Sequence, residues 1–301
     1  MIVYLTNNEI DREQWDTCIS NSHTIKPYGY SWFLDCMSPG WQALADDDYD
    51  SVFPLPGFSR FGIRYLATPV FLQQLGAFSP DKPSPDMLNE FLEYLPSFYR
   101  LVDLCVGQKV DYEGFRITEK VNYELDLSKP YEKLREQFST HCRRNIDSAS
   151  KKKPHLSEDV TPGQLIDLFI QNKGKEIKGI KSRDYKRLSD LMNYCLANKK
   201  GRIIAVKSGI KNIIYGSFIV ETKGNKTMLF VVNTQKSREK RIGYYVVNEI
   251  IREFSSTHTT LDFAGSSIPS IASFMESFGS VKVPFYRIYQ NRLFWPARLL
   301  K

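Results

Sequence analysis

One junction in the last third of the chain constrains the fold most. The apolar run LFVVN (residues 229–233) predicts a strand, TQKSREKRIG (234–243) a basic turn ending in glycine, and YYVVNEIIREF (244–254) a helix. A helix start presents N–H groups without intrahelical partners and a partial positive charge. Arg238 and Arg241 add full charges at that point. The junction therefore predicts a phosphate-binding turn.

Composition limits the class of protein. A chain of 301 residues that is 42% hydrophobic and 25% charged is expected to be globular, with one large or two ordinary domains. No run approaches the ~20 apolar residues of a membrane span, and no secretory signal is visible. Five scattered cysteines without CxxC indicate reduced thiols, hence a cytoplasmic protein. The four histidines lack metal-ligand spacing, so we expect no metal.

The net charge of +7 is concentrated in residues 143–153 and 173–187. Such runs indicate either a nucleic-acid or anionic-substrate surface, or solvated helix faces, and the second reading is favoured for each run alone. No zinc-finger, helix-turn-helix or RNP signature is present. A nucleotide-bearing cofactor would need only a few of these charges.

The two halves of the sequence repeat one pattern. Residues 41–58 and 202–220 each read as strand, polar turn and strand, and 100–107 parallels 259–266. This favours an α+β (α/β-like) chain of two duplicated domains over one long sheet, although two unrelated α/β domains remain an alternative. We expect domains at residues 1–128 and 129–301, each a mixed, mostly antiparallel sheet flanked by helices, with a linking helix at 130–152.

Three passages resemble a known family. They are YLATPVFLQQLGAFS (65–79), YELDLSKPYEKLREQFSTHCRRNIDSASKK (123–152) and LDFAGSSIPSIASFMESFGSVKVPFYRI (261–288). In this order they resemble the tandem-GNAT acyltransferase group, which includes the Fem-type peptidoglycan aminoacyltransferases. The resemblance covers nearly the full length and implies two GNAT-like domains in one chain.

The resemblance also implies a donor site. GNAT proteins hold the pyrophosphate of acyl-CoA at a turn of pattern Q/R-x-x-G-x-G/A before a helix, and here Arg241 replaces the first glycine of that pattern. The strand before the turn is expected to splay from its neighbour, so that its backbone N–H can polarise a carbonyl. The implied cofactor-binding residues are Val232, Asn233, Arg238, Arg241, Gly243 and Tyr244.

Amine acylation needs a base for the ammonium and an acid for the leaving group, although water can mediate both. Many GNAT enzymes place a Tyr where this chain has Met275. The candidate catalytic residues are therefore Asp262, at the end of an expected inner strand, and Tyr286. A structural role for Asp262, capping the next turn through Ser266 or Ser267, is an equal alternative. Glu249 is expected at the surface.

The resemblance implies an acyltransferase that moves an acyl group from acetyl-CoA or another acyl-CoA to a small-molecule or peptide amine held between the two domains. One alternative is a Fem-type transferase with an aminoacyl-tRNA donor, although no stretch matches the coiled-coil insertion of some tRNA-dependent Fem enzymes. A second alternative is a ligand-binding protein without catalysis. A nucleic-acid-binding protein is the least favoured.

Overall fold

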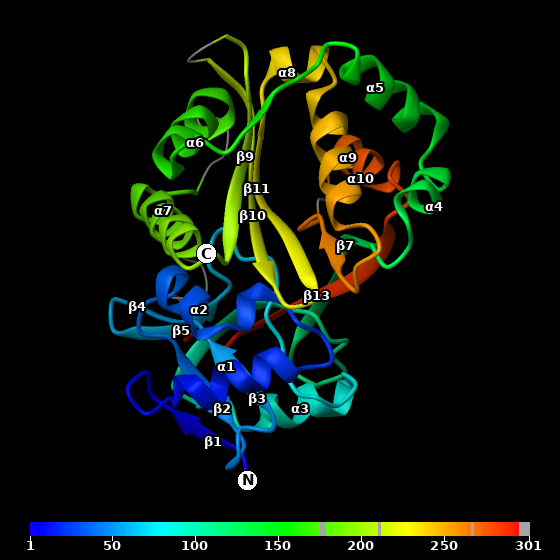
Figure 1. The fold of residues 1–301 in the computed structure, drawn as a ribbon. Coiled ribbons are helices and arrows are strands. Elements are labelled where there is room, and N and C mark those ends of the chain that lie inside the picture. The colour runs from blue at the N-terminus through cyan, green and yellow to red at the C-terminus, as the bar shows by residue number, and fades with distance from the viewer. Residues whose placement is uncertain (175–178, 210–211, 266–267, 295–301) are drawn as a thin grey trace. The chain divides into compact units, whose positions relative to one another are not determined.

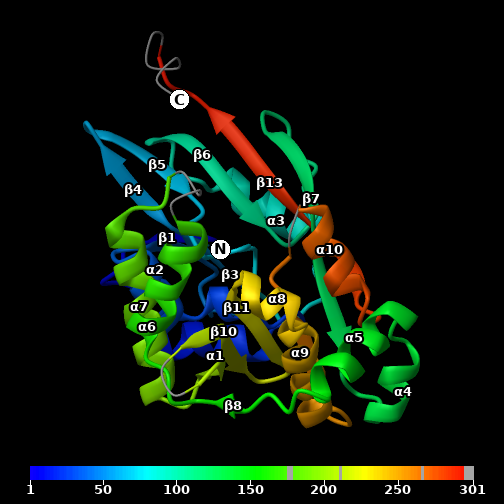
Figure 2. The ribbon, with the colours of Figure 1, turned by 90° about the horizontal axis from the view of Figure 1, so that it is seen from above.

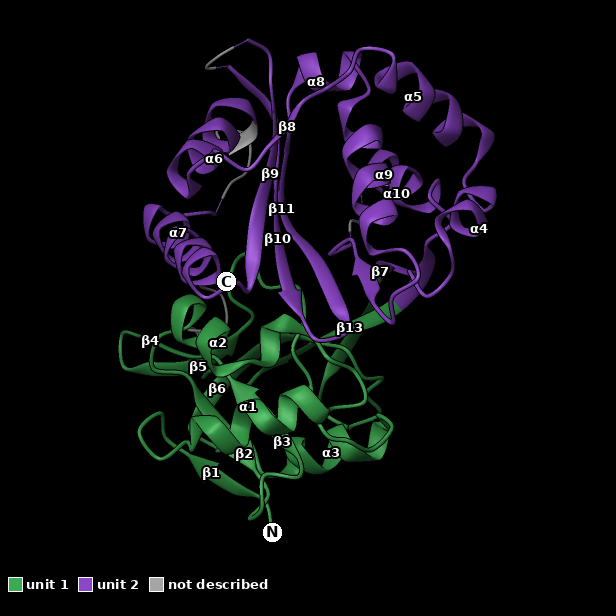
Figure 3. Cartoon of the chain, in the orientation of Figure 1, with its two compact units in different colours: residues 1–121, 284–301 green, residues 122–283 purple. Residues whose placement is uncertain are grey.

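A computed structural model describes residues 1–174, 179–209, 212–265 and 268–294. The chain combines helices with mixed sheets (Figure 1), which confirms the expected α+β class. It divides into two compact units (Figure 3). Unit 1 comprises Met1–Val121 and Pro284–Lys301, and unit 2 comprises Asn122–Val283.

The division differs from the expected one at residues 128 and 129. Along the chain, the boundary between unit 1 and unit 2 falls inside strand β7 (Arg116–Asp126). The chain returns to unit 1 within strand β13 (Val281–Asn291). The return has a simple cause: β13 pairs antiparallel with β6 (Tyr99–Val106), from Tyr286 opposite Val106 to Asn291 opposite Leu101. A pattern read along the chain does not reveal this long-range pairing.

Unit 1 contains two groups of strands. The antiparallel order β1-β2-β3 joins β1 (Val3–Leu5), β2 (Gln42–Ala45) and β3 (Val52–Leu55). The order β4-β5-β6-β13 adds β4 (Gly57–Arg60) and β5 (Ile63–Ala67), with β5 and β6 parallel. Its helices are α1 (Arg12–Asn21), the 3₁₀ turn η1 (Pro27–Gly29), α2 (Ser31–Met37) and α3 (Pro85–Glu93).

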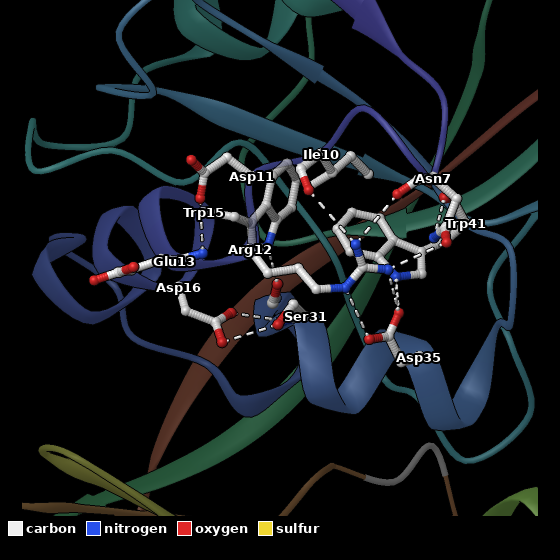
Figure 4. A network of polar contacts seen from close by, with 11 residues as sticks. Asn7, Ile10, Asp11, Arg12, Glu13, Trp15, Asp16, Ser31, Asp35 and Trp41 are labelled. Carbon is white, nitrogen blue, oxygen red and sulfur yellow. Dashed lines mark hydrogen bonds and ion pairs between the residues drawn. The ribbon is translucent and has the colours of Figure 1, made fainter.

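A polar network fixes α1 to α2 (Figure 4). Asp11 caps α1 by accepting from the N–H groups of Glu13 and Gln14. Arg12 donates two hydrogen bonds to the carboxylate of Asp35, at 3.1 and 3.2 Å. Trp41 donates its ring N–H to the same carboxylate at 2.8 Å. Because the indole of Trp41 is buried, this bond orients a core residue of unit 1.

Unit 2 is built on strands in the order β7-β12-β11-β10-β9-β8. Only β11 (Asn225–Asn233) and β12 (Thr260–Asp262) pair in parallel; β10 (Ile213–Thr222), β9 (Gly201–Lys207) and β8 (Leu156–Ser157) continue antiparallel within the described residues. The helices are α4 (Tyr131–Glu136), α5 (Thr140–Ser150), α6 (Pro162–Phe169), the π-helical turn η2 (Ile170–Gly174), α7 (Ser182–Ala197), α8 (Gln235–Glu239), α9 (Ile242–Phe254) and α10 (Pro269–Glu276).

Helices cover both faces of this sheet. The short helix α6 and the longer α7 lie on one side of β9, β10 and β11, while α9, α5 and α10 lie on the other (Figure 1, Figure 2). Gly216 of β10 lies under Leu165 of α6, and a Cβ there would overlap Leu165 Cδ1, so a larger side chain would require Leu165 to move. On the opposite face Tyr215 lies next to Gly243 of α9. The sheet of unit 2 is thus enclosed on both faces, as its apolar strands require.

The expected single helix over residues 130–152 is wrong, because the structure has two helices, α4 and α5. Ser139 separates them: its hydroxyl accepts from Cys142 N–H at 3.1 Å, which caps α5, and its own N–H donates to the carbonyl of Ser277 at 2.9 Å. The buried ring of Phe138 packs against Phe278, with ring centroids 5.4 Å apart. These local and tertiary contacts outweigh helix continuation.

Candidate functional site

Strand β11 separates from its neighbour β12 after a short paired stretch. The two are in register only at Asn225, Lys226 and Thr227, the last opposite Asp262. Phe230 to Asn233 stay paired with β10 beyond a register irregularity, but no strand among the described residues pairs with the other edge of β11 past Thr227. The expected splay of this strand is therefore confirmed, and it leaves a gap in the sheet of unit 2.

A cavity of about 530 Å³ occupies this gap. Its volume is within the range of small-molecule sites. One wall comes from β10 and β11, and the other from Phe263 and helix α10. The six residues predicted to bind a donor all line it: Val232, Asn233, Arg238, Arg241, Gly243 and Tyr244. Their role in binding stays a prediction, but the fold does bring them together.

The basic turn has an unusual backbone at Arg241. This residue is the N-cap of α9 and lies in the left-handed region, with φ 62° and ψ 24°. A side chain there costs about 1–2 kcal/mol relative to glycine. The position is the one where the GNAT pattern has its first glycine. Arg241 thus keeps the backbone conformation that glycine favours while adding a cation at the helix start.

Positive charge gathers where α9 begins. The first N–H groups of a helix lack intrahelical acceptors, and the helix dipole adds to their field. Arg238 and Arg241 are exposed beside them, and no carboxylate in the described part of the chain is within ion-pair distance of either guanidinium. Arg238 is oriented by a 2.6 Å hydrogen bond to the carbonyl oxygen of Asn233. This end of the cavity can hold a phosphate.

The hydrogen-bonding pattern of β11 turns backbone donors into the gap. Thr234 N–H donates to the carbonyl of Ile214 on β10 at 3.2 Å. This bond fixes which alternate residues of β11 direct their N–H groups at β10. In an antiparallel ladder alternate residues face the partner strand. The N–H groups of Val231 and Asn233 therefore point away from β10. Val231 lines the cavity and is 39% exposed, so its N–H can donate to a carbonyl oxygen there.

The cavity draws residues from both faces of the sheet. Tyr215 and Asn233 are register partners on the α9 face, where both lie close to Gly243. Phe230 and Val232 point to the α6 face, where the rings of Phe230 and Phe169 are 4.8 Å apart. Phe169 and Asn172, at the end of α6 and in η2, line the cavity together with Met228. The gap thus connects one side of the sheet with the other.

Two groups at the cavity, the half-buried Tyr244 hydroxyl and the buried Cys142 thiol, are held in their neutral forms. Burial raises the pKa of the Tyr244 hydroxyl, whose ring packs edge-on against Phe274 at 4.8 Å. Burial raises the pKa of the neighbouring Cys142 thiol to about 11. The Tyr244 hydroxyl is therefore protonated at neutral pH and available as a hydrogen-bond donor, while Cys142 is inert.

Asp262 does not line this cavity. Its side chain is fully buried, and one carboxylate oxygen accepts from Asn122 Nδ2 at 2.9 Å and from Ala264 N–H at 2.8 Å. These bonds link β12 to β7 and hold the turn that follows β12, which favours the structural alternative. The two serines expected to complete that cap, Ser266 and Ser267, lie outside the described residues.

The other candidates are placed as follows. Tyr286 belongs to unit 1, on β13 opposite Val106, and is not among the cavity residues of unit 2. Glu249 lies partly buried on α9, where its carboxylate accepts from Asn248 and Arg252. Met275 does line the cavity. No side chain of the described lining is a carboxylate or an imidazole.

Sequence reasoning missed much of the apolar wall. The lining residues that the sequence analysis did not single out include Phe169, Met228, Phe263, Ile271 and Phe274. One signal was available, because Ile271 and Met275 are four residues apart and so lie on one face of α10. The others depend on where the strands diverge.

Within the described ranges, no three His, Cys, Asp or Glu side chains gather in an arrangement that could hold a metal ion. Among the helices of the same residues, none has the length and apolar character needed to cross a membrane.

Comparisons with known proteins bear on the fold. No protein-family profile matches the sequence, and no curated protein matches it. Among solved structures, FemX superposes with a TM-score of 0.66 at 12% identity over 97% of this chain and 98% of its own. A conserved protein of unknown function from Bacteroides thetaiotaomicron has a TM-score of 0.59 at 12% identity, covering 96% and 99%. The C-terminal domain of a putative lysylphosphatidylglycerol synthetase from Agrobacterium fabrum has 0.55 at 11%, covering 93% and 92%.

At these identities the likeness concerns the fold. The chain has the fold of FemX along nearly its whole length. The resemblance drawn from the sequence motifs is confirmed at that structural level.

Proposed function

We propose that the protein is an acyltransferase that moves an acyl group from acyl-CoA, such as acetyl-CoA, to an amine. The observation that carries this is the gap between β11 and β12, with the cationic start of α9 at one end and the Val231 N–H facing into it. A phosphate-bearing thioester would place its phosphates by Arg238 and Arg241. Its carbonyl would lie along the unpaired edge of β11.

The reaction then needs little acid–base help from the chain. The amine nitrogen attacks the thioester carbon, the C–N bond forms, and the C–S bond breaks. The Val231 N–H stabilises the oxyanion that develops on the carbonyl oxygen. Thiols are acidic groups, with a pKa of about 8.5 for cysteine, so the departing sulfur leaves as a thiolate without a strong acid. This accounts for Met275 at the position where a Tyr is often found, and water accepts the proton of the amine.

The amine would approach from the α6 face of the gap. Phe169 and Asn172 line that side. An aromatic ring and an amide there suit a small-molecule or peptide amine. The two substrates would meet across the edge of β11, where the carbonyl is polarised.

An aminoacyl-tRNA donor is the second candidate. It is favoured by the fold likeness to FemX and to the lysylphosphatidylglycerol synthetase domain. It is also favoured by exposed cations on and after α5, including Arg144, Lys151 and Lys152, in the basic run 143–153. The second basic run, 173–187, is described only in part. A tRNA contacting several of these cations would bind with a steep salt dependence.

The test is thermal unfolding with CoA, acetyl-CoA, longer acyl-CoAs and charged tRNA. A ligand at 100 times its Kd should add about 2.7 kcal/mol of stability. Stabilisation by CoA and thiol release with an amine panel support the acyltransferase. Stabilisation only by charged tRNA, lost with salt, supports the second candidate. CoA binding without thiol release for any amine would identify a ligand-binding protein without catalysis.

A further inference from the structure

We infer that the acyl group this site takes is uncharged, apolar and longer than acetyl. The inference rests on the proposed function, because it assumes that an acyl donor occupies the gap beside β11. It follows from how charge and apolar surface are distributed along the cavity.

The cavity is polar at one end and apolar at the other. The two cationic lining residues lie just before α9: Arg238 belongs to α8, and Arg241 is the N-cap of α9. Where β11 and β12 begin to diverge, the first residues not paired with each other are Met228 and Phe263, each 5% exposed. A ligand with phosphates at the arginines therefore has its opposite end among apolar side chains.

The strand provides a scale for this ligand. From Asn233, beside the turn, to Met228 is five residue steps, or about 17 Å of extended strand. Val231, whose N–H faces the gap, lies between them, about 10 Å from Met228. A thioester carbonyl at Val231 thus leaves several ångströms of apolar cavity beyond it. An acetyl group, with one methyl beyond the carbonyl, does not fill that space.

Helix α10 forms the wall of this apolar part. Ile271 and Met275 lie one turn apart on α10, and both line the cavity; Met275 is 7% exposed. Methionine side chains adapt to ligands of different shape because they are unbranched and polarisable. Met228 and Met275 together therefore suit a flexible alkyl chain better than a single rigid group.

The lining also disfavours a charged acyl group. None of the described residues that line the cavity is a carboxylate, so an ammonium on the acyl group would lose its water without gaining a counter-charge. This separates simple acyl donors from aminoacyl donors, whose acyl group carries an ammonium beside the carbonyl.

The experiment measures the Kd of CoA, acetyl-CoA, butyryl-CoA, hexanoyl-CoA and β-alanyl-CoA by calorimetry on the full chain. β-Alanyl-CoA matches butyryl-CoA in length but ends in an ammonium. We expect Kd to fall about fourfold per added methylene until the cavity is full. We expect β-alanyl-CoA to bind at least tenfold more weakly than butyryl-CoA. CoA binding with no dependence on length, or equal binding of the matched pair, would overturn the inference and leave the acyltransferase proposal standing.

A variant tests whether the dependence of Kd on acyl length arises in the apolar part of the cavity. Ile271→Trp should fill the apolar part and abolish the gain from longer chains. Ser273→Trp, on the exposed side of the same helix and outside the lining, is the control and should keep the length dependence. Equal behaviour of the two variants contradicts the inference. Absence of CoA binding by the wild-type chain would remove both this inference and the proposed acyl-CoA function.

Discussion

The guanidinium of Arg238 donates a 2.6 Å hydrogen bond to the carbonyl oxygen of Asn233, the last residue of β11. This bond ties the turn to the strand whose free edge lines the cavity, and it holds one cation beside the start of α9. One side chain, Arg238, thus both holds the turn against β11 and supplies positive charge to the cavity.

Removing both cations of the turn should weaken donor binding. Arg238→Ala together with Arg241→Ala is expected to cost roughly 2–4 kcal/mol of CoA binding free energy, because each loses a charge-assisted contact. Calorimetry measures this directly. Lys236→Ala is the control, since Lys236 is an exposed cation of α8 that does not line the cavity. Unchanged affinity in the double variant would rule out a phosphate site here.

Two substitutions at Arg241 can separate the effect of its charge on binding from the cost of its left-handed backbone to stability. Arg241→Gly and Arg241→Ala lose the same guanidinium, but only glycine relieves the φ of 62°. We expect Arg241→Gly to be more stable than Arg241→Ala by about 1 kcal/mol in denaturant unfolding. Both should bind CoA equally weakly if charge is what matters. Restored binding in the glycine variant would show instead that close backbone approach is decisive.

A methyl group at Gly243 should narrow the donor end of the cavity. A Cβ there would lie 3.2 Å from Asn233 Nδ2 and 3.7 Å from the rings of Phe274 and Tyr215. Gly243 is in a helix, where alanine is better than glycine by about 1 kcal/mol, so Gly243→Ala should fold well. We expect weaker CoA binding with no loss of melting temperature. Unchanged affinity would place the ligand away from α9.

Substitutions of Asp262 can distinguish a catalytic role of this residue from a structural one. Asp262→Ala removes the acceptor for Asn122 Nδ2 and Ala264 N–H in a fully buried place, which should cost about 1–3 kcal/mol of unfolding free energy. Thermal unfolding measures it. Asp262→Asn, which keeps one side-chain oxygen as an acceptor, should lose less unfolding free energy than Asp262→Ala. If Asp262→Asn instead lowered turnover with an unchanged melting temperature, the catalytic role expected from the sequence would be the correct one.

Buried thiols should make the protein less stable in alkali. Burial raises the pKa of Cys18 from 9.0 to about 12 and that of Cys142 from 9.0 to about 11. Above pH 9 the unfolded chain releases these protons and the folded chain keeps them. Stability is therefore full below pH 9 and falls above it, by up to about 1.4 kcal/mol per pH unit for each thiol.

Cys18→Ala should reduce this slope between pH 9 and 11 relative to wild type, measured by urea unfolding at fixed pH. Cys142→Ala should reduce it too, with its effect ending near pH 11. Parallel slopes in wild type and both variants would show that other groups cause the alkaline loss.

Local sequence signals determined the elements and the turn of the candidate site. The apolar run of β11, the basic residues and Gly243 predict a strand, a turn and a helix start, because hydrophobic periodicity and capping act over a few residues. The strand predicted at 229–233 and the strand, turn and strand predicted at 202–220 follow the same logic, and the structure has β11 (Asn225–Asn233), β9 and β10 there. The single helix over 130–152 failed because Ser139 bonds to Ser277, far along the chain.

Only tertiary structure decided where the cavity lies and what lines it. The separation of β11 from β12 depends on pairing that stops after Thr227, and the burial of Asp262 depends on Asn122, 140 positions earlier. The assignment of Tyr286 to unit 1 follows from the pairing of β13 with β6. Each of these features depends on contacts between segments that are distant in the sequence, and packing and strand register in three dimensions set the free energy of those contacts. Hydrophobic periodicity along the chain therefore does not predict them.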